Sequence, residues 1–396
     1  MNGAFRRLFS EGFRVFFLLA GVTGVALLLI WEVHLVAGPA GALPEMISAG
    51  IAAQQWHAHE LVFGYASAAL AGFLLTAVPN WTGTAPAGGR FILTAALLWL
   101  LGRIAIMASA ELPWQAVAVL DLAFVPLLVV RISLQLLTRP KPQNAVFVVF
   151  LTLYWCANLA VHLGWAGLWE GGEDRGLRAG LMALAGMILV IGGRITPAFT
   201  RNAMQGGGLS ADLPADPAFF APLMILAALA LPVTWLALGG GAVAGAVAIA
   251  AGSAQLARQT FWRAGFAWRQ PILATLHVSI ALVAIGLLLT GLARFAILSE
   301  LAGLHVLGIG GVGGMTLAVM SRATLGHGGR PLIAPLPVAL AYGCLPVAAF
   351  LRWLAAEFGG ALHDPATLAA GLLWIAAFAL FTVALWPVFW GGAGQD

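Results

Sequence analysis

Two histidines and a glutamate open one long apolar run. His57, His59 and Glu60 stand at the head of QQWHAHELVFGYASAALAGFLLTAVPNWTG, residues 54–83. Imidazole nitrogens bind iron, copper and zinc, and histidine also transfers protons near neutral pH. Because ionisable groups are costly in an apolar environment, those found there are functional candidates. The run therefore indicates a metal site, a haem site or a proton-transfer site.

The other histidines separate by their depth in the apolar runs. His305 heads a second run, and His34 and His162 are expected near the same side of the membrane. His277 lies about 9 Å inside the opposite end of its run, at 1.5 Å per helical residue. His277 therefore belongs to a second site, a proton path or helix packing.

His57 and His59 face different directions if the run is a regular helix. Two residues correspond to about 200° around the axis. Either the two histidines serve two centres, or one is a ligand and the other pairs with a carboxylate such as that of Glu60. The face below His57 carries small residues, and the run headed by His305 holds five glycines, Gly308, Gly310, Gly311, Gly313 and Gly314.

A haem between these two helices is one interpretation of the small faces. A flat macrocycle needs smooth walls and axial ligands, which His57 and His305 could supply. Membrane helices also pack directly on one another through small residues. The pattern leaves both interpretations open.

Arginines gather at the other end of the same runs. Arg194 and Arg322, followed by Arg201 and Arg330, lie near His327. They could bind haem propionates, an anionic headgroup or a small anion. Arginines also anchor helices at the cytoplasmic face of a membrane, which is the commoner reason for such a cluster.

The composition excludes several functional classes. The chain is 61% hydrophobic and 9% charged over 396 residues, which is typical of a polytopic helical membrane protein. A net charge of +4, spread along the chain, does not indicate nucleic-acid binding. The sequence contains no GxSxG, Walker P-loop or HExxH motif, so the familiar hydrolytic sites are excluded.

The elements that must position these residues are about twelve transmembrane helices in a single membrane domain, residues 1–396. The predicted spans are 13–37, 57–78, 91–109, 113–137, 144–168, 178–199, 217–238, 240–258, 271–292, 301–321, 335–355 and 366–390. We expect the first to be a retained span, because no small-residue cleavage site follows it. Cys156 and Cys344 are expected to be buried free thiols.

The distribution of basic residues predicts the orientation. Of the 19 Lys and Arg residues, 14 fall on one side if both termini are cytoplasmic. The five on the outer side are Arg103, Arg175, Arg178, Arg294 and Arg352. This asymmetry favours an even number of spans with the N- and C-termini inside.

A faint internal repeat relates three of the spans. MILVIGGRITPAFTRN at 187–202 aligns with MTLAVMSRATLGHGGR at 315–330, and the end of span 57–78 is similar. The three spans are four helices apart, which predicts three four-helix units. Helix ends that face the same membrane surface can also be alike without a repeat.

Four motifs together resemble the NnrS family over most of the chain. They are WHAHELVFGYASAALAGFLLTAVPNWTG, GRITPAFTRN, the pair LH at 276–277, and LHVLGIGGVGGMTLAVMSRATLGHGGR at 304–330. The opening GFRVFFLLAG is similar too, with Val15 where a proline is more usual.

The resemblance implies a bacterial inner-membrane protein linked to nitric oxide, denitrification and nitrosative stress. It implies haem, with a b-type haem expected, and copper. The candidate ligands carried over by motif position are His57, His59, His277, His305 and His327. Whether the chain turns nitric oxide over, as an oxidoreductase like the nitric oxide reductases would, stays open.

By analogy, haem–copper oxidases and nitric oxide reductases also have twelve core helices in three arcs of four. Haem ligands there lie on the second and tenth spans, which matches His57 and His305. The predicted sixth and seventh spans here hold no histidine for the usual copper site, which puts copper in doubt.

The expected function is therefore binding or reduction of nitric oxide at a histidine-ligated haem between spans 57–78 and 301–321. Membrane lipids surround the protein, and reduction would need a quinol or an electron-donor protein. One alternative is a secondary transporter of a small molecule or metal that uses the same histidines. Another is an assembly factor that holds haem or copper for a different enzyme.

Overall fold

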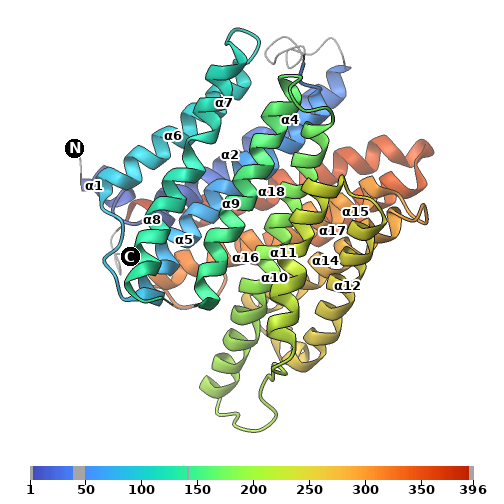
Figure 1. Cartoon of the computed structure of the whole chain (residues 1–396). Helices are drawn as coiled ribbons and strands as arrows, with labels where there is room; N and C mark the ends of the chain where they lie inside the picture. Colours follow the sequence, from blue (N-terminus) through green and yellow to red (C-terminus); the bar gives the residue numbers. More distant parts are fainter. Residues whose placement is uncertain (1–2, 39–49, 141, 392–396) are drawn as a thin grey trace. The chain divides into compact units, whose positions relative to one another are not determined.

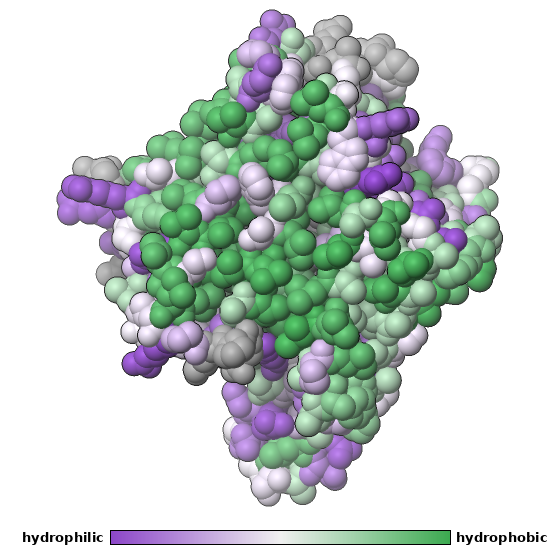
Figure 2. Space-filling model, in the orientation of Figure 1, coloured by the Kyte–Doolittle hydropathy of each residue, from purple (hydrophilic) through white to green (hydrophobic). Residues whose placement is uncertain are grey.

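Each predicted apolar run forms a helix in the computed structural model, which describes residues 3–38, 50–140 and 142–391 (Figure 1). Those residues contain no strand, which confirms the all-α fold class. Eleven helical segments are long and apolar enough to cross a membrane. In Figure 2 the visible face is mostly hydrophobic, with hydrophilic residues at its margins, as a lipid-facing surface requires.

The first half of the chain supplies six of the predicted spans. After the short α1 (Gly3–Leu8), these are α2 (Gly12–Ala37), α4 with η2 and α5 (Ala53–His59, Glu60–Tyr65, Ala66–Thr82), α6 (Gly89–Met107), α7 with α8 (Trp114–Leu122, Phe124–Thr138), α9 (Pro142–Trp165) and α10 (Gly172–Gly206). The longest of them, α10, extends several residues beyond both ends of the predicted span 178–199.

The second half supplies the other six. These are α11 (Phe220–Leu238), α12 (Ala242–Gln259), α14 (Pro271–Ala293), α15 with η4 and α16 (Glu300–His305, Val306–Gly313, Gly314–His327), α17 (Leu336–Phe358) and α18 (His363–Trp390). Short helical turns lie between them, namely η3 (Thr260–Trp262), α13 (Ala264–Ala267) and η5 (Gly360–Leu362). The eighteen-residue α12 falls outside the eleven apolar segments, because serine, glutamine and arginine occupy its second half.

The helices form two compact units. Unit 1 comprises Met1–Gly180, Ala323–Pro331 and Phe381–Asp396, and unit 2 comprises Leu181–Arg322 and Leu332–Leu380. Within unit 1, α2 packs along α5, and within unit 2, α12 packs along α14. The finer grouping into three four-helix units stays a prediction. Both cysteines are free, as expected, but they are half-buried instead of buried.

The predicted span 113–137 is broken at Ala123, between α7 and α8. Pro126 has no N–H, so the carbonyl of Leu122 loses its usual helical donor. The indole of Trp155, on α9, donates to that carbonyl at 3.1 Å. The break lies directly after Asp121, whose carboxylate belongs to the site described below.

Arg14 ties α2 to the end of α18 within unit 1. Its guanidinium is buried, and Nη1 donates to the carbonyl oxygens of Val388 at 2.5 Å and Gly391 at 2.9 Å. Those carbonyls lie at the C-terminal end of α18, where the last four carbonyls of a helix lack helical partners. The arginine therefore caps α18 from another helix.

Arg14→Met is expected to lower stability by about 1–3 kcal/mol, because buried carbonyls would lose a charged donor. Thermal unfolding of the detergent-solubilised protein measures the loss, and hydrogen exchange near Val388 locates it. Arg90→Met, at an exposed position that starts α6, is the control. Equal losses in the two variants would contradict the capping role.

Candidate functional site

The site in unit 1 begins where an α-helix changes to a π-helix. α4 ends at His59, and the π-helical η2 covers Glu60–Tyr65 before the α-helix resumes. In a π-turn the hydrogen bonds run over five residues instead of four, and such turns are frequent at functional sites. This turn sets the direction in which His59 points.

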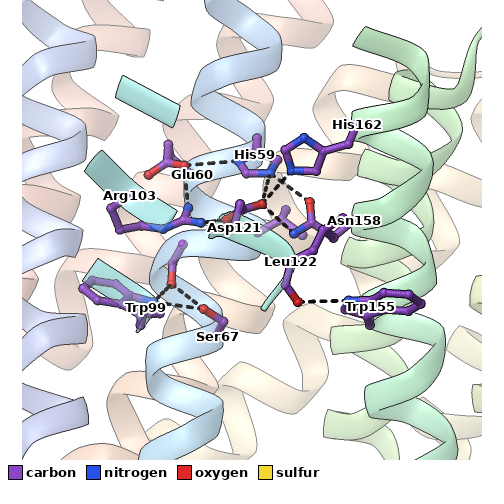
Figure 3. Close-up of polar contacts among 12 residues, drawn as sticks. His59, Glu60, Ser67, Trp99, Arg103, Asp121, Leu122, Trp155, Asn158 and His162 are labelled. Atoms are coloured by element: carbon purple, nitrogen blue, oxygen red, sulfur yellow. Dashed lines mark hydrogen bonds and ion pairs between the residues drawn. The ribbon is translucent and has the colours of Figure 1, made fainter. Parts of the chain in front are cut away.

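Side chains from neighbouring helices bind carbonyls of the π-segment. The hydroxyl of Tyr154, on α9, donates to Val62 O at 2.5 Å, and the indole of Trp99, on α6, donates to Gly64 O at 3.0 Å. Ser67 Oγ also donates to Gly64 O, at 2.9 Å. Helices α6 and α9, which both contribute to the site, thus stabilise the π-segment, and Figure 3 shows the contact of Trp99.

Six side chains from four helical segments meet beside this turn, and we call them the His59 cluster. They are His59, Glu60, Arg103, Asp121, Asn158 and His162 (Figure 3). Except for Arg103, which is part-buried, all of them are buried. Ionisable groups at such a depth are rare and normally pair with one another.

Arg103 joins the two carboxylates of the cluster. Its Nη1 donates to Glu60 Oε1 at 2.5 Å, and its Nη2 donates to Asp121 Oδ1. One guanidinium therefore contacts two carboxyl groups, so the acidic groups of this pair outnumber the arginine by one. The cluster therefore suits one further positive charge.

His59 lies where that charge is needed. Its Nδ1 is 3.1 Å from Glu60 Oε1, and its Nε2 is 2.9 Å from Asn158 Oδ1 and 3.3 Å from Asp121 Oδ2. The amide nitrogen of Asn158 donates to Asp121 Oδ2 at 2.8 Å, which directs the amide oxygen towards His59. Both ring nitrogens thus face oxygen atoms, and a metal cation bound at Nε2 would supply the positive charge that the cluster lacks.

Three of these residues also meet the spacing of a metal centre. One ligand atom each from His59, Asp121 and His162 lies within 4.8 Å of the other two. His162 Nε2 is 2.8 Å from Asp121 Oδ2. Two imidazoles and one carboxylate form a donor set that suits iron, copper or zinc, and three protein ligands leave a coordination position open. The donor chemistry therefore fits a transition-metal ion.

Aromatic side chains surround the two histidines. The ring of His59 lies 5.2 Å from that of Phe63 and 5.0 Å from that of Trp165, and His162 lies 5.5 Å from Trp165. A low-dielectric surrounding of this kind strengthens each charge interaction within the cluster.

His57 points elsewhere, as the 200° separation predicts. Its ring stacks on Trp31 of α2 at 4.3 Å, and His34 lies 5.4 Å from the same indole. His59 pairs with Glu60, which was one of the two arrangements considered for this pair. The ring of His327, also in unit 1, lies 5.7 Å from that of Phe13. Among the described contacts, His327 belongs neither to the His59 cluster nor to the rings around Trp31.

The remaining predicted ligands lie in unit 2. His305 ends α15, and its Nδ1 is 2.8 Å from the carbonyl oxygen of Leu301. A donor bond to that carbonyl leaves Nε2 as the free lone pair, which is the usual arrangement of a metal-binding histidine. Directly after His305 the π-helical η4 begins, so His59 and His305 both precede a π-segment.

His277 and the two arginines also belong to unit 2. His277 Nε2 is 2.9 Å from Thr200 Oγ1. Arg322 lies over the ring of Phe199 at 3.9 Å, and Arg194 is half-buried on α10. Because the predicted haem ligands His57 and His305 lie in different units, the haem between spans 57–78 and 301–321 stays a prediction, as does the propionate role of the arginines.

Sequence reasoning does not name four members of the His59 cluster as site residues: Arg103, Asp121, Asn158 and His162, the last of which it only places near the outer side of the membrane. Asp121 was included in an apolar run, and Arg103 was counted as an outer-side topology residue, although it pairs with two buried carboxylates. An aspartate among WQAVAVLDLAFVPLL is itself a signal, because an acid at that depth requires a partner. Asn158 gives no comparable signal, since a neutral amide is common in membrane helices.

Fold and site together define a multi-pass helical membrane protein with a buried histidine–carboxylate cluster. The family model described as NnrS protein matches residues 7–392. The chain belongs to the NnrS family, which supports, at family level, a nitric-oxide-related membrane protein associated with haem or metal. A comparison with curated proteins found no match.

Proposed function

We propose that the protein acts in nitric oxide metabolism in the bacterial inner membrane and that His59, Asp121 and His162 hold a metal ion there. The observation that carries the proposal is the mutual distance of at most 4.8 Å between the three ligand atoms. Family membership supports the nitric oxide link. The predicted orientation, with both termini in the cytoplasm, belongs to the same proposal.

An iron or copper ion at these residues would supply an open coordination position for nitric oxide. The surrounding residues hold the ligands in place. Glu60 contacts Nδ1 of His59 at 3.1 Å and so fixes the orientation of the ring. Asn158 and Arg103 hold the two oxygens of Asp121. Aromatic rings exclude water from the histidines.

The haem predicted from the sequence is a separate part of the proposal. In that hypothesis His57 and His305 would hold the haem, and Arg194 and Arg322 would bind its acidic groups. His305 supports it, because its bond to Leu301 O leaves Nε2 available. The stack of His57 on Trp31 holds that ring in a defined orientation.

The metal site is tested by elemental analysis of the purified protein, before and after incubation with iron(II) or copper(I). His162→Ala removes one ligand. Loss of a residue that only orients a ligand weakens metal affinity by about 10–100-fold, so the loss of His162 itself is expected to be at least that large. His363→Ala, at a half-exposed position that starts α18, is the matched control. The same protein is titrated with nitric oxide, and the spectral response should fall with the metal content.

Equal metal content in wild type and His162→Ala would contradict the proposed metal site. The visible spectrum of the oxidised and dithionite-reduced protein tests haem independently. A haem spectrum lost in both His57→Ala and His305→Ala, and kept in His162→Ala, supports the two separate sites. A colourless protein from haem-replete cells would refute the haem.

A further inference from the structure

Unit 2 contains a second buried polar cluster, which we call the His277 cluster. Its members are Thr196 and Thr200 on α10, Gln255 and Gln259 on α12, Trp262 on η3 and His277 on α14. Thr196, Gln255, Trp262 and His277 are each at most 3% exposed. Several of their polar atoms have no hydrogen-bond partner among the described residues, namely Thr196 Oγ1, Gln255 Nε2 and Oε1, Gln259 Oε1, Trp262 Nε1 and His277 Nδ1.

Two hydrogen bonds and one ring contact place Thr200, Gln259 and Trp262 beside His277, and Thr196 and Gln255 lie one helical turn from two of these residues. Gln259 Nε2 donates to the backbone oxygen of His277 at 2.7 Å, and the rings of Trp262 and His277 are 6.3 Å apart. Thr200 contacts His277, and Thr196 lies one helical turn before Thr200. Gln255 lies one turn before Gln259 on the same helix. Buried polar atoms are normally satisfied, so their concentration here indicates a missing ligand.

The neighbouring bonds define which proton His277 carries. Thr200 Oγ1 donates its hydrogen to the carbonyl of Thr196 at 2.9 Å. Its oxygen must therefore accept from His277 Nε2 at 2.9 Å, so Nε2 carries the proton. Nδ1 of the neutral ring is then a buried hydrogen-bond acceptor. Trp262 Nε1 and Gln255 Nε2 are donors, so the cluster offers both kinds of group to one ligand.

The charge of the cluster excludes ionic ligands. It contains no carboxylate, and one imidazole with two amide oxygens is a poor set for a divalent cation. A neighbouring cation, Arg258, lies over Trp262 at 5.3 Å, and it binds both oxygens of Asp216 at 2.7 Å. An anion would therefore find that arginine already neutralised. The ligand must be neutral, and it must both donate and accept hydrogen bonds.

We propose that the His277 cluster binds the headgroup of a membrane quinol. A hydroquinone is neutral and apolar in its body, and it carries hydroxyls that can donate to His277 Nδ1 and accept from Trp262 or Gln255. Its oxidised form accepts from the same indole and amide. This site is independent of the proposed metal site, because all its residues lie in unit 2 and the metal ligands lie in unit 1.

The test is thermal unfolding of the full-length protein in detergent, with and without decylubiquinol or decylubiquinone. Saturating quinol should raise the wild-type Tm by roughly 3 °C or more, because a ligand that binds only the folded state stabilises it. Gln255→Leu removes two unsatisfied polar atoms at similar volume. Its Tm without quinol should match or exceed that of wild type, and the quinol response should disappear.

Two further variants and one control complete the test. His277→Phe should weaken quinol binding at least about tenfold in calorimetry, as the loss of a buried acceptor predicts. Thr290→Val, on the same helix, loses only an internal bond to Gly286 O and should respond to quinol like wild type. The proposal would be overturned if quinol left the wild-type Tm unchanged, or if it raised the Tm of Gln255→Leu as much as that of wild type. Either result would indicate that water fills the cluster. Metal content should be the same in all these variants, so failure here leaves the metal site standing.

Discussion

Arg103→Met is expected to destabilise the protein by about 3–5 kcal/mol, which is the range for removal of one partner from a buried ion pair. The methionine keeps the length of the side chain but leaves the carboxylates of Glu60 and Asp121 without their shared cation. Both carboxylates are buried, so water cannot replace the guanidinium. Thermal unfolding in detergent should show the loss as a lower Tm.

The cause can be isolated with a second substitution. Glu60→Gln in the Arg103→Met background removes one of the two repelling charges and should recover part of the lost stability. Arg178→Met breaks the pair with Asp174 on α10, whose carboxylate side chain is 60% exposed, and should cost less than about 1 kcal/mol. If Arg103→Met cost no more than Arg178→Met, the cluster would not depend on the ion pair.

Gly252→Val is expected to separate α12 from α14. A Cβ at Gly252 would lie 2.5 Å from the backbone oxygen of Ala284, so the two helices would have to move apart. Gly245 and Gly291 make a similar close approach on the same helix pair. Overpacking typically costs about 1–3 kcal/mol, and more is expected here because the obstacle is backbone.

The same substitution should also weaken the His277 cluster, because Gln255 and Gln259 lie on α12 and His277 lies on α14. A lower Tm together with a lost quinol response is the expected result. Gly343→Val, at a helical glycine on α17 where a Cβ meets nothing within 4 Å, controls for the propensity of valine. Equal Tm values for the two variants would show that the α12–α14 contact tolerates expansion.

The fold could be predicted because apolar runs and basic residues are local signals. Each run forms a helix, and a contact between one of the two histidines and Glu60 is one of the two arrangements that the sequence predicts for the head of the run. What could not be predicted depends on distant partners. Asp121, Asn158 and His162 come from α7 and α9, and only tertiary packing brings them to His59. The grouping into two compact units likewise cannot be predicted from the hydropathy of the sequence, because it depends on which helices pack together.

The π-segments were also beyond prediction, for a related reason. Nothing in ELVFGY distinguishes it from ordinary α-helical sequence, and its carbonyls accept bonds from Tyr154 and Trp99 on other helices. Pro126 indicates a break near Ala123, because proline removes one backbone donor. The sequence does not indicate that Trp155 donates to the carbonyl of Leu122 instead. At Glu60–Tyr65 and at Ala123 the chain departs from the regular helix where a side chain from another helix bonds a backbone carbonyl.

The π-segment Glu60–Tyr65 changes the direction in which side chains before it point, relative to those after it. One residue more or less turns everything on one side of it by about 100° relative to the other side. His59 can therefore face Asp121 while the small residues of α5 face α2, although a single uninterrupted helix would tie the two directions together. A one-residue insertion or deletion in this segment would turn His59 away from Asp121 and Asn158, so the length of the segment determines whether the His59 cluster forms.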